Sequence, residues 1–262
     1  MDLMLRGKTA LIMSSSKGIG KGIALSLALE GCNLILTSSN QKNLEISKHE
    51  IQKESNVNVK IYVMDVTSSL KVDEAGKKIV EECHNIDIMV GNGPGPRPVS
   101  CLDMSVEQLR SAIQTNFISS VQLTKLVLPN MIEKKFGRII YMTSTTAKEL
   151  DEGLVLSDSS RSGLLAYAKT LSREIAKHNI TVNCILTGGV LSDRSNELIK
   201  HDARSQGRSY EKVLDQINAL IPCGYIATPE VFSHVITFLC SPLAKYITGV
   251  AIPIDGGYMK SV

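Results

Sequence analysis

The chain has 262 residues, of which 43% are hydrophobic, 21% are charged and 4% are aromatic, and its formal net charge is +3. This composition is typical of a globular protein, and the length allows one α/β domain with a substantial core, so we expect a single domain over residues 1–262. Lys and Arg do not gather in long runs, so the chain lacks the basic footprint of a nucleic-acid-binding protein. No segment approaches the roughly 18 apolar residues of a membrane span, and the first residues lack a signal-peptide pattern. We therefore expect a cytoplasmic protein with neither nucleic acid nor membrane as a partner.

Six cysteines are scattered along the chain without a C-x-x-C pair and without a His at ligand spacing beside any of them. This arrangement is unlike that of a zinc site, and we expect no metal. Disulfide sets are typical of small secreted proteins, so the thiols are expected to be small buried hydrophobic groups that stay reduced. The six are Cys32, Cys83, Cys101, Cys184, Cys223 and Cys240.

Apolar runs alternate with helix-like stretches along the whole chain. The apolar runs that predict strands lie at residues 9–13, 33–37, 59–64, 86–90, 138–142, 181–186 and 251–254. Helical spacing or composition marks residues 23–28, 41–55, 68–83, 106–134 and 159–178. Continuous apolar strands separated by helices predict a doubly wound α/β fold, in which helices cover both faces of a parallel sheet. Residues 191–212 are polar and irregular, and we interpret them as a flexible lid.

In such a sheet, ligands bind beyond the carboxyl ends of the strands, so the residues after each strand carry the functional prediction. The first strand is followed by Ser14, Ser16, Lys17, Gly18, Ile19 and Gly20, and then by a helix. Glycines in this position let the backbone approach a pyrophosphate, while the helix N-terminus directs its free N–H groups toward it. The pattern favours a dinucleotide site; the alternative is a tight turn that binds no ligand.

The residues near the expected adenosine ribose indicate the type of cofactor. The second strand ends in neutral residues that include Ser38 and Ser39, whereas an Asp or Glu at this place usually holds the 2′-hydroxyl of NAD. Lys17 adds a cation in the first turn, which favours the 2′-phosphate of NADP; NAD stays the second choice. The alternative is that Lys17 is a solvated loop residue and that hydroxyl groups alone hold the ribose.

The chain resembles the short-chain dehydrogenase/reductase family, whose fingerprint is T-G-x-x-x-G-x-G. Gly18 and Gly20 match it, whereas Met13 and Ser14 stand where the family has Thr and Gly, so a residue with a Cβ makes the tight first turn. The resemblance covers residues 6–257 and implies a Rossmann-type fold. It also implies cofactor contacts at positions that match later family motifs, which are Asp65, Val66, Asn92, Gly93, Gly188, Val190 and Ser192.

Members of this family use Asn, Ser, Tyr and Lys together in catalysis. By resemblance, Asn116 and Ser144 take the first two places. The Tyr and Lys are expected thirteen and seventeen residues after the Ser, and this chain has Ser157 and Arg161 there. A Ser hydroxyl cannot be tuned toward neutral pH as a phenol with a pKa of about 10 can. Arg161 can bind the nicotinamide ribose and carry positive charge, but it cannot give up a proton.

Three Tyr residues and two acidic residues are candidate substitutes for the missing Tyr. Tyr141 precedes Ser144 by three residues on a strand, so it points to the opposite side of the sheet. Tyr167 lies about 15 Å further along the same helix than Ser157 and faces another direction. Tyr210 in the expected lid and the acidic residues Glu152 and Asp158 have no spacing argument, and solvated surface groups are the better interpretation of all three.

The leading hypothesis is an NADP-dependent oxidoreductase that transfers hydride between nicotinamide and a carbonyl or alcohol substrate with a non-standard proton donor. Ser144 would orient the carbonyl oxygen, Ser157 would act directly or through water, Arg161 would hold the ribose, and Asn116 would support a water chain. By resemblance to 3-oxoacyl-acyl-carrier-protein reductases and their relatives, the substrate is a 3-oxoacyl thioester, a sugar or a small ketone. The alternative is a nucleotide-binding regulatory or partner subunit that has lost this activity.

Two further expectations concern partners. Basic residues in the expected lid favour an anionic substrate, although a polar loop without this role explains them as well; they are Arg194, Lys200, His201, Arg204 and Arg208. Relatives pair their two long helices across subunits, which implies a homodimer or homotetramer. The apolar positions that fit such pairing, or fit burial against the chain's own sheet, are Leu164, Leu165, Ala168 and Leu171.

Overall fold

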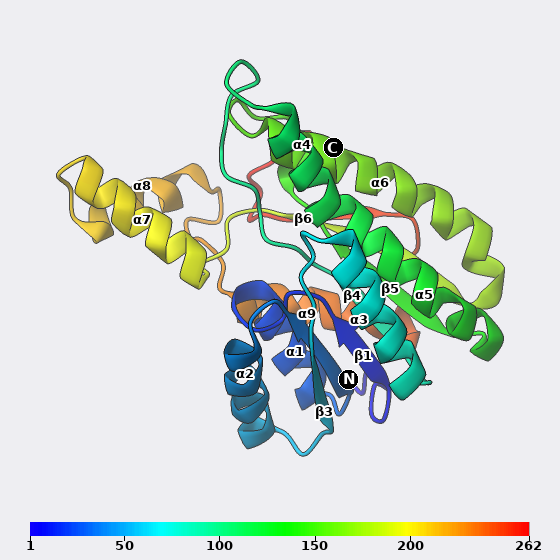
Figure 1. Ribbon diagram of the computed structural model, residues 1–262. Coiled ribbons are helices and arrows are strands. Elements are labelled where there is room, and N and C mark those ends of the chain that lie inside the picture. Colours follow the sequence, from blue (N-terminus) through cyan, green and yellow to red (C-terminus); the bar gives the residue numbers. More distant parts are fainter. Residues whose placement is uncertain (262) are drawn as a thin grey trace.

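Seven parallel strands form a single sheet at the centre of the computed structural model, which describes residues 1–261 without the side chains of residues 193 and 194 (Figure 1). The strand order is β3-β2-β1-β4-β5-β6-β7. This order confirms the predicted doubly wound parallel sheet. The strands are β1 (Thr9–Ile12), β2 (Asn33–Ser38), β3 (Val59–Val63), β4 (Ile88–Gly91), β5 (Gly137–Met142), β6 (Ile180–Thr187) and β7 (Ala251–Ile254).

Helices cover both faces of the sheet. Helices α1, α2 and α9 share one buried core with one side of the sheet, and α3, α5 and α6 share a second core with the other side. The helices are α1 (Gly18–Leu29), α2 (Gln41–Glu54), α3 (Ser69–Glu82), α4 (Val106–Ile113), α5 (Ser119–Lys134), α6 (Val155–Ile175), α7 (Asp193–Ser205), α8 (Tyr210–Leu220) and α9 (Pro229–Cys240). None of the helices within residues 1–261 is long and apolar enough to cross a membrane.

The apolar runs become strands because both of their faces are buried. In β1, Ala10 and Ile12 belong to the core under α1, while Leu11 and the following Met13 belong to the core under α5 and α6. Successive side chains of a strand point to opposite faces, so a strand covered on both sides needs apolar residues at every position. This requirement explains why the central strands are visible in the sequence as continuous apolar runs.

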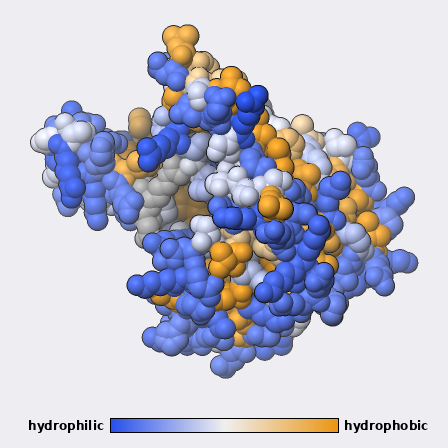
Figure 2. All heavy atoms as spheres, in the orientation of Figure 1, coloured by the Kyte–Doolittle hydropathy of each residue, from blue (hydrophilic) through white to orange (hydrophobic). Residues whose placement is uncertain are grey.

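The expectation of an irregular segment at residues 191–212 is wrong, because this region forms α7 and the start of α8. Ser192 and Ser209 cap the two helices by accepting hydrogen bonds from the backbone N–H groups of Ser195 and Lys212. The helices pack on each other around a small core of Ile199, Ala203 and Val213. Together they protrude from the body of the molecule as a lobe with a largely hydrophilic surface (Figures 1 and 2).

Other element boundaries also differ from the sequence prediction. Helix α9 was not predicted; Thr228 caps it and Pro229 occupies its first turn, which is a common start signal. Helix α6 begins at Val155, four residues before the expected start at 159. The first four N–H groups of a helix have no acceptor within the helix, and a capping side chain that accepts from them is the usual signal of a helix start. Leu154 provides no such cap, so the sequence carries little signal for the start of α6.

The apolar positions of the long helix α6 that fitted either subunit pairing or burial pack against the chain's own sheet. Leu164, Ala168 and Leu171 lie in the core between α6 and its own sheet. The expectation for the cysteines is met in part, since all six are free, but Cys101 and Cys223 are exposed.

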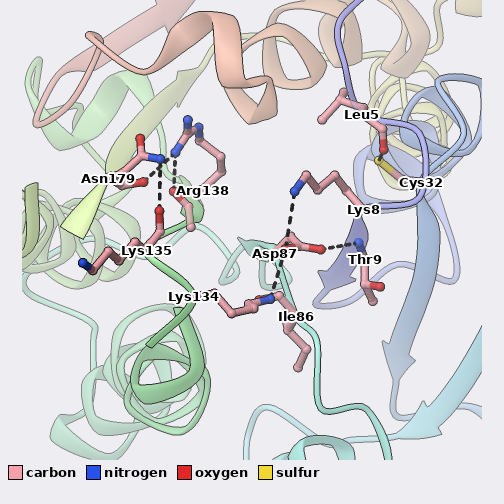
Figure 3. A network of polar contacts seen from close by, with 11 residues as sticks. Leu5, Lys8, Thr9, Cys32, Ile86, Asp87, Lys134, Lys135, Arg138 and Asn179 are labelled. Atoms are coloured by element: carbon pink, nitrogen blue, oxygen red, sulfur yellow. Dashed lines mark hydrogen bonds and ion pairs between the residues drawn. The ribbon is translucent and has the colours of Figure 1, made fainter. Parts of the chain in front are cut away.

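Charged side chains tie the sheet together at the edge opposite the expected ligand site (Figure 3). The carboxylate of Asp87 accepts hydrogen bonds from the backbone N–H of Thr9 at 2.9 Å and from Nζ of Lys134 at 3.0 Å. Arg138 is fully buried, and its guanidinium donates to the backbone carbonyls of Ser241 at 3.2 Å and Asn179 at 2.9 Å. These contacts connect β5 to the segments that precede β6 and follow α9.

We expect the substitution Arg138→Met to lower the free energy of unfolding by about 2 kcal/mol or more, because it leaves buried carbonyl groups without a donor. Urea unfolding followed by circular dichroism measures the effect. The matched control, Arg173→Met on the exposed side of α6, should change stability by less than about 0.5 kcal/mol. Equal stability of the two variants would contradict the structural role of Arg138.

Candidate active site

A cavity of about 440 Å³ opens at the carboxyl ends of β1 to β4 and is bounded on one side by the start of α7. Most of the residues predicted to contact the cofactor line it: Ser14, Ser16, Lys17, Gly18, Ile19, Ser38, Ser39, Asp65, Val66, Asn92, Gly93 and Ser192. The sequence analysis did not single out the remaining lining residues, Met64, Thr67, Pro94 and Glu197. Met64, Thr67 and Pro94 are sequence neighbours of predicted positions, so the sequence could have indicated them. Glu197 lines the cavity because residues 193–205 form a helix, which the sequence did not predict.

The turn after β1 brings backbone segments into close contact. Ser14 has φ of +48°, in the left-handed region that a residue with a Cβ adopts at a cost. A Cβ on Gly20 would lie 2.4 Å from the carbonyl oxygen of Ser14 and 3.0 Å from Nδ2 of Asn92. Asn92 itself donates a hydrogen bond to that oxygen at 3.4 Å. Only glycine fits at position 20, while the strain of the turn is carried at Ser14.

The N-terminus of α1 faces the cavity without a side-chain cap. Lys17 is the N-cap residue, and its side chain makes no capping hydrogen bond. It is exposed and lines the cavity together with Gly18 at the first position of the helix. Free N–H groups and the positive end of the helix dipole make such a terminus suitable for a phosphate, and the ammonium of Lys17 adds to this field.

Hydroxyl groups define the far end of the cavity. Oγ of Ser16 donates a hydrogen bond to Oγ of Ser38 at 2.8 Å, and both side chains line the cavity beside Ser39. Asp65 accepts hydrogen bonds from the Thr67 hydroxyl at 2.7 Å and from its N–H at 3.0 Å, and the former is the main reason why the pKa of Asp65 is lowered. Asp65 therefore stays ionised and shapes the turn after β3.

Three predicted cofactor residues are not part of the cavity lining. Gly20 underlies the first turn, and Gly188 allows the end of β6 to pass close to Asp255, whose Cα would lie 2.6 Å from a Cβ at position 188. Val190 is buried and pairs with Ala227 in a short bridge before α9. These residues place the backbone that surrounds the cavity.

Asn116 lies in a π-helical turn, Gln114–Ile118, that interrupts the long helix expected at 106–134. Its Nδ2 donates to the carbonyl of Ala112 at 3.2 Å, and the N–H of Ser119 bonds to the carbonyl of Gln114 across five residues. The turn contacts the cavity wall, because a Cβ on Gly93 would lie 3.0 Å from the carbonyl oxygen of Thr115. Single π-helical turns of this kind are frequent at functional sites.

Ser144 and Ser157 lie on either side of Thr146, a residue that the sequence analysis did not single out. Oγ1 of Thr146 donates to Oγ of Ser144 at 3.1 Å and lies 3.3 Å from Oγ of Ser157. The N–H of Thr146 also donates to Oγ of Ser144, at 3.2 Å. The only signal in the sequence was the position of Thr146 two residues after Ser144, which is typical of a turn closed by a Ser hydroxyl.

Arg161 is buried and binds the backbone that leads into this hydroxyl cluster. Its guanidinium donates to the carbonyl of Thr143 at 2.7 Å, immediately before Ser144. Because α6 begins at Val155, Ser157 and Arg161 lie one helical turn apart on the same face. The structure thus brings together three of the four predicted catalytic residues, whereas Asn116 lies beside Gly93 of the cavity, where a Cβ at position 93 would be 3.5 Å from its Oδ1.

The alternative proton donors have partners elsewhere. The hydroxyl of Tyr141 lies 2.6 Å from Oγ1 of Thr124, and full burial raises the pKa of Tyr141 well above its usual value. Tyr167 packs against the rings of Tyr141 and Phe117 on the same side of the sheet. The hydroxyl of Tyr210 donates to Asn196 at 2.6 Å within the α7–α8 lobe. Asp158 is buried, so the expectation that it is a solvated surface group is wrong; its Oδ2 accepts from the N–H of Asp151 at 3.3 Å.

The sheet order and a glycine-lined cavity at the point where the strand order reverses define the class of dinucleotide-binding α/β proteins. The model of the family described as Enoyl-(Acyl carrier protein) reductase matches residues 13–259. The chain is 30% identical to the NADPH-dependent reductase BacG of Bacillus subtilis (strain 168), over 97% of this chain and 99% of the relative. It is also 30% identical to the 3-oxoacyl-(acyl-carrier-protein) reductase FabG of Escherichia coli (strain K12), over 96% of this chain and 97% of the relative.

A solved structure extends these similarities. L-sorbose reductase from Gluconobacter frateurii, in complex with NADPH and L-sorbose, is 27% identical, covers 100% of both chains and superposes with a TM-score of 0.96. The chain belongs to the short-chain dehydrogenase/reductase family and is an NAD(P)-dependent oxidoreductase of the short-chain type. Relatives named for NADPH agree with the cofactor that the sequence favours.

We expect Gly20→Ala to weaken NADPH binding by about tenfold or more, because the added methyl group collides with backbone and cannot be accommodated by a side-chain movement. Fluorescence titration with NADPH measures this change. Unchanged binding by Gly20→Ala would show that the first turn is not part of the cofactor site.

Ser14→Gly should stabilise the protein by about 0.5 kcal/mol, since glycine adopts the left-handed conformation without strain. Thermal unfolding measures the effect.

Proposed function

We propose that this protein binds NADPH and reduces a carbonyl compound by hydride transfer, with serine hydroxyls in place of the usual Tyr as the source of the proton. The observation that carries the proposal is the pairing of two features at one edge of the sheet. A glycine-lined cavity lies at the ends of β1 to β4, and a cluster of hydroxyl groups beside a buried guanidinium lies at the end of β5.

The residues of the cavity fit a dinucleotide phosphate. The uncapped N-terminus of α1 would bind the pyrophosphate, and Ser16, Ser38 and Lys17 would bind the adenosine ribose and its 2′-phosphate. Ser38 and Ser39 stand where an NAD-binding protein usually has a carboxylate, so a 2′-phosphate meets no repulsion at the end of β2. The carbonyl of Val190 and the hydroxyl of Ser192 would receive the carboxamide, as the family resemblance implies.

We expect calorimetric titration to show tighter binding of NADPH than of NADH. Lys17→Met should weaken NADPH binding by about tenfold, which corresponds to the loss of one charged hydrogen bond, and should weaken NADH binding less, because NADH lacks the 2′-phosphate. Lys53→Met, an exposed lysine in the last turn of α2, is the matched control. Equal affinity for the two nucleotides would contradict the assignment of NADPH, and binding of neither would contradict the oxidoreductase.

The proposed roles follow from the positions of the side chains. The bound cofactor supplies the hydride. Ser144 donates a hydrogen bond to the carbonyl oxygen of the substrate, and Ser157 belongs to the path that resupplies the proton. Arg161 places a permanent positive charge at the carbonyl of Thr143, next to Ser144, and this charge would favour the negative charge that develops on the substrate oxygen. Asn116 supports the water that exchanges protons with this cluster.

The names of the relatives suggest the probes for activity. One relative is a reductase of 3-oxoacyl groups and another is an L-sorbose reductase, so the substrate is proposed to be a 3-oxoacyl thioester, a sugar or another small ketone. The start of α7 borders the cavity in the place of a lid. The exposed basic residues of the lobe favour an anionic substrate; those with described side chains are Lys200, His201, Arg204 and Arg208. The side chain of Arg194, which the sequence analysis also named, lies outside the described residues.

Activity separates this proposal from a nucleotide-binding subunit without catalysis. We expect the wild-type protein to oxidise NADPH in the presence of acetoacetyl-coenzyme A or L-sorbose, and the double variant Ser157→Tyr with Arg161→Lys to lose this turnover. The exposed Ser159→Tyr in the same helical turn is the control and should remain active. A double variant that is strongly more active than the wild type would show a disabled scaffold and would support the regulatory alternative.

A further inference from the structure

The hydroxyl of Thr146 connects the two serines of the proposed active site. It donates to Oγ of Ser144 at 3.1 Å and lies 3.3 Å from Oγ of Ser157, so the three oxygen atoms form a continuous chain. The three residues come from two elements: Ser144 and Thr146 from the short turn after β5, and Ser157 from the first turn of α6. All three side chains are partly buried.

The number of hydrogen bonds that each hydroxyl can form gives the chain a direction. A hydroxyl has one hydrogen to donate and two lone pairs to accept. Oγ of Ser144 accepts from both the N–H and the hydroxyl of Thr146, so its own hydrogen remains to be donated. Thr146 uses its hydrogen on Ser144, and therefore the contact with Ser157 requires that Ser157 donates to Thr146. All donors thus point from Ser157 toward Ser144 and the substrate.

We propose that Thr146 is the middle member of a three-hydroxyl proton relay. The inference rests on the proposed carbonyl reduction. When hydride forms the new C–H bond at the carbonyl carbon, the carbonyl oxygen takes the proton of Ser144. In the same movement Ser144 takes the proton of Thr146, Thr146 takes that of Ser157, and Ser157 takes a proton from a solvent water, whose hydroxide is neutralised by the bulk solvent. Each hydroxyl gains one O–H bond as it loses another, so the relay leaves no hydroxyl ionised.

This arrangement removes the difficulty that a lone serine presents. A single Ser that gave up its proton would become an alkoxide, a strong base that is unfavourable near neutral pH. In a concerted relay the charge never rests on a side chain. One positive feature lies beside the acceptor end: the guanidinium of Arg161 donates to the carbonyl of Thr143, the residue before Ser144. It favours the oxygen that becomes negative as hydride arrives.

The decisive substitution is Thr146→Val, which keeps the branched shape and removes the hydroxyl. We expect kcat for NADPH oxidation with acetoacetyl-coenzyme A or L-sorbose to fall by about 100-fold, the usual contribution of a positioned proton donor, with unchanged affinity for NADPH. Thr146→Ser restores the hydroxyl and should retain most of the activity. Thr145→Val, a substitution of the same type at the preceding buried residue of the turn, is the matched control and should be as active as the wild type.

A measurement on the wild-type protein does not depend on how any variant folds. Turnover rates in mixtures of H₂O and D₂O should curve downward with the deuterium fraction, because several protons move in one step, and Thr146→Val should lose this curvature. A straight line for the wild type, or full activity of Thr146→Val, would overturn the relay and leave the carbonyl reductase intact. Absence of wild-type turnover with every carbonyl probe would overturn the reductase, and the relay with it.

Discussion

All seven strands run in the same direction, and the rest of the molecule depends on this constraint. Each pair of parallel strands requires a crossover that returns the chain to the same starting edge, so every strand ends at the same side of the sheet. The turns after β1, β3, β4 and β5 therefore meet along one edge although their residues are far apart in the sequence. At the opposite edge, Asp87 and the buried Arg138 hold the segments between elements together (Figure 3).

The two halves of the site use different physical means. The nucleotide half depends on the closeness of backbone segments, which Gly20 permits and which Ser14 makes possible only in a left-handed conformation. The proposed catalytic half depends on side-chain hydroxyl groups held by a short turn and by the first turn of α6. Arg161 connects the two elements that carry these hydroxyl groups, since it lies on α6 and binds the backbone at the end of β5.

The sequence was sufficient to predict the sheet and most of the cavity lining, because buried parallel strands and a glycine-rich turn leave strong local patterns. It was not sufficient for features that depend on contacts between distant segments. The α7–α8 pair looked irregular because its apolar positions are few and serve only a small core. The sequence on both sides of the π-helical turn at Asn116 has helical spacing, so the turn left no sequence signal. The role of Thr146 depends on its contact with Ser157, which only the fold brings about.

Ser192 connects the lobe of α7 and α8 to the first turn of the nucleotide site, because a Cβ on Gly18 would lie only 3.5 Å from that of Ser192. The lobe has its own small core, separate from the two large cores that flank the sheet. Local opening of a protein costs least where few apolar contacts are lost. Displacement of the lobe therefore breaks fewer apolar contacts than opening of either large core, so the stability of the lobe is separated from that of the sheet.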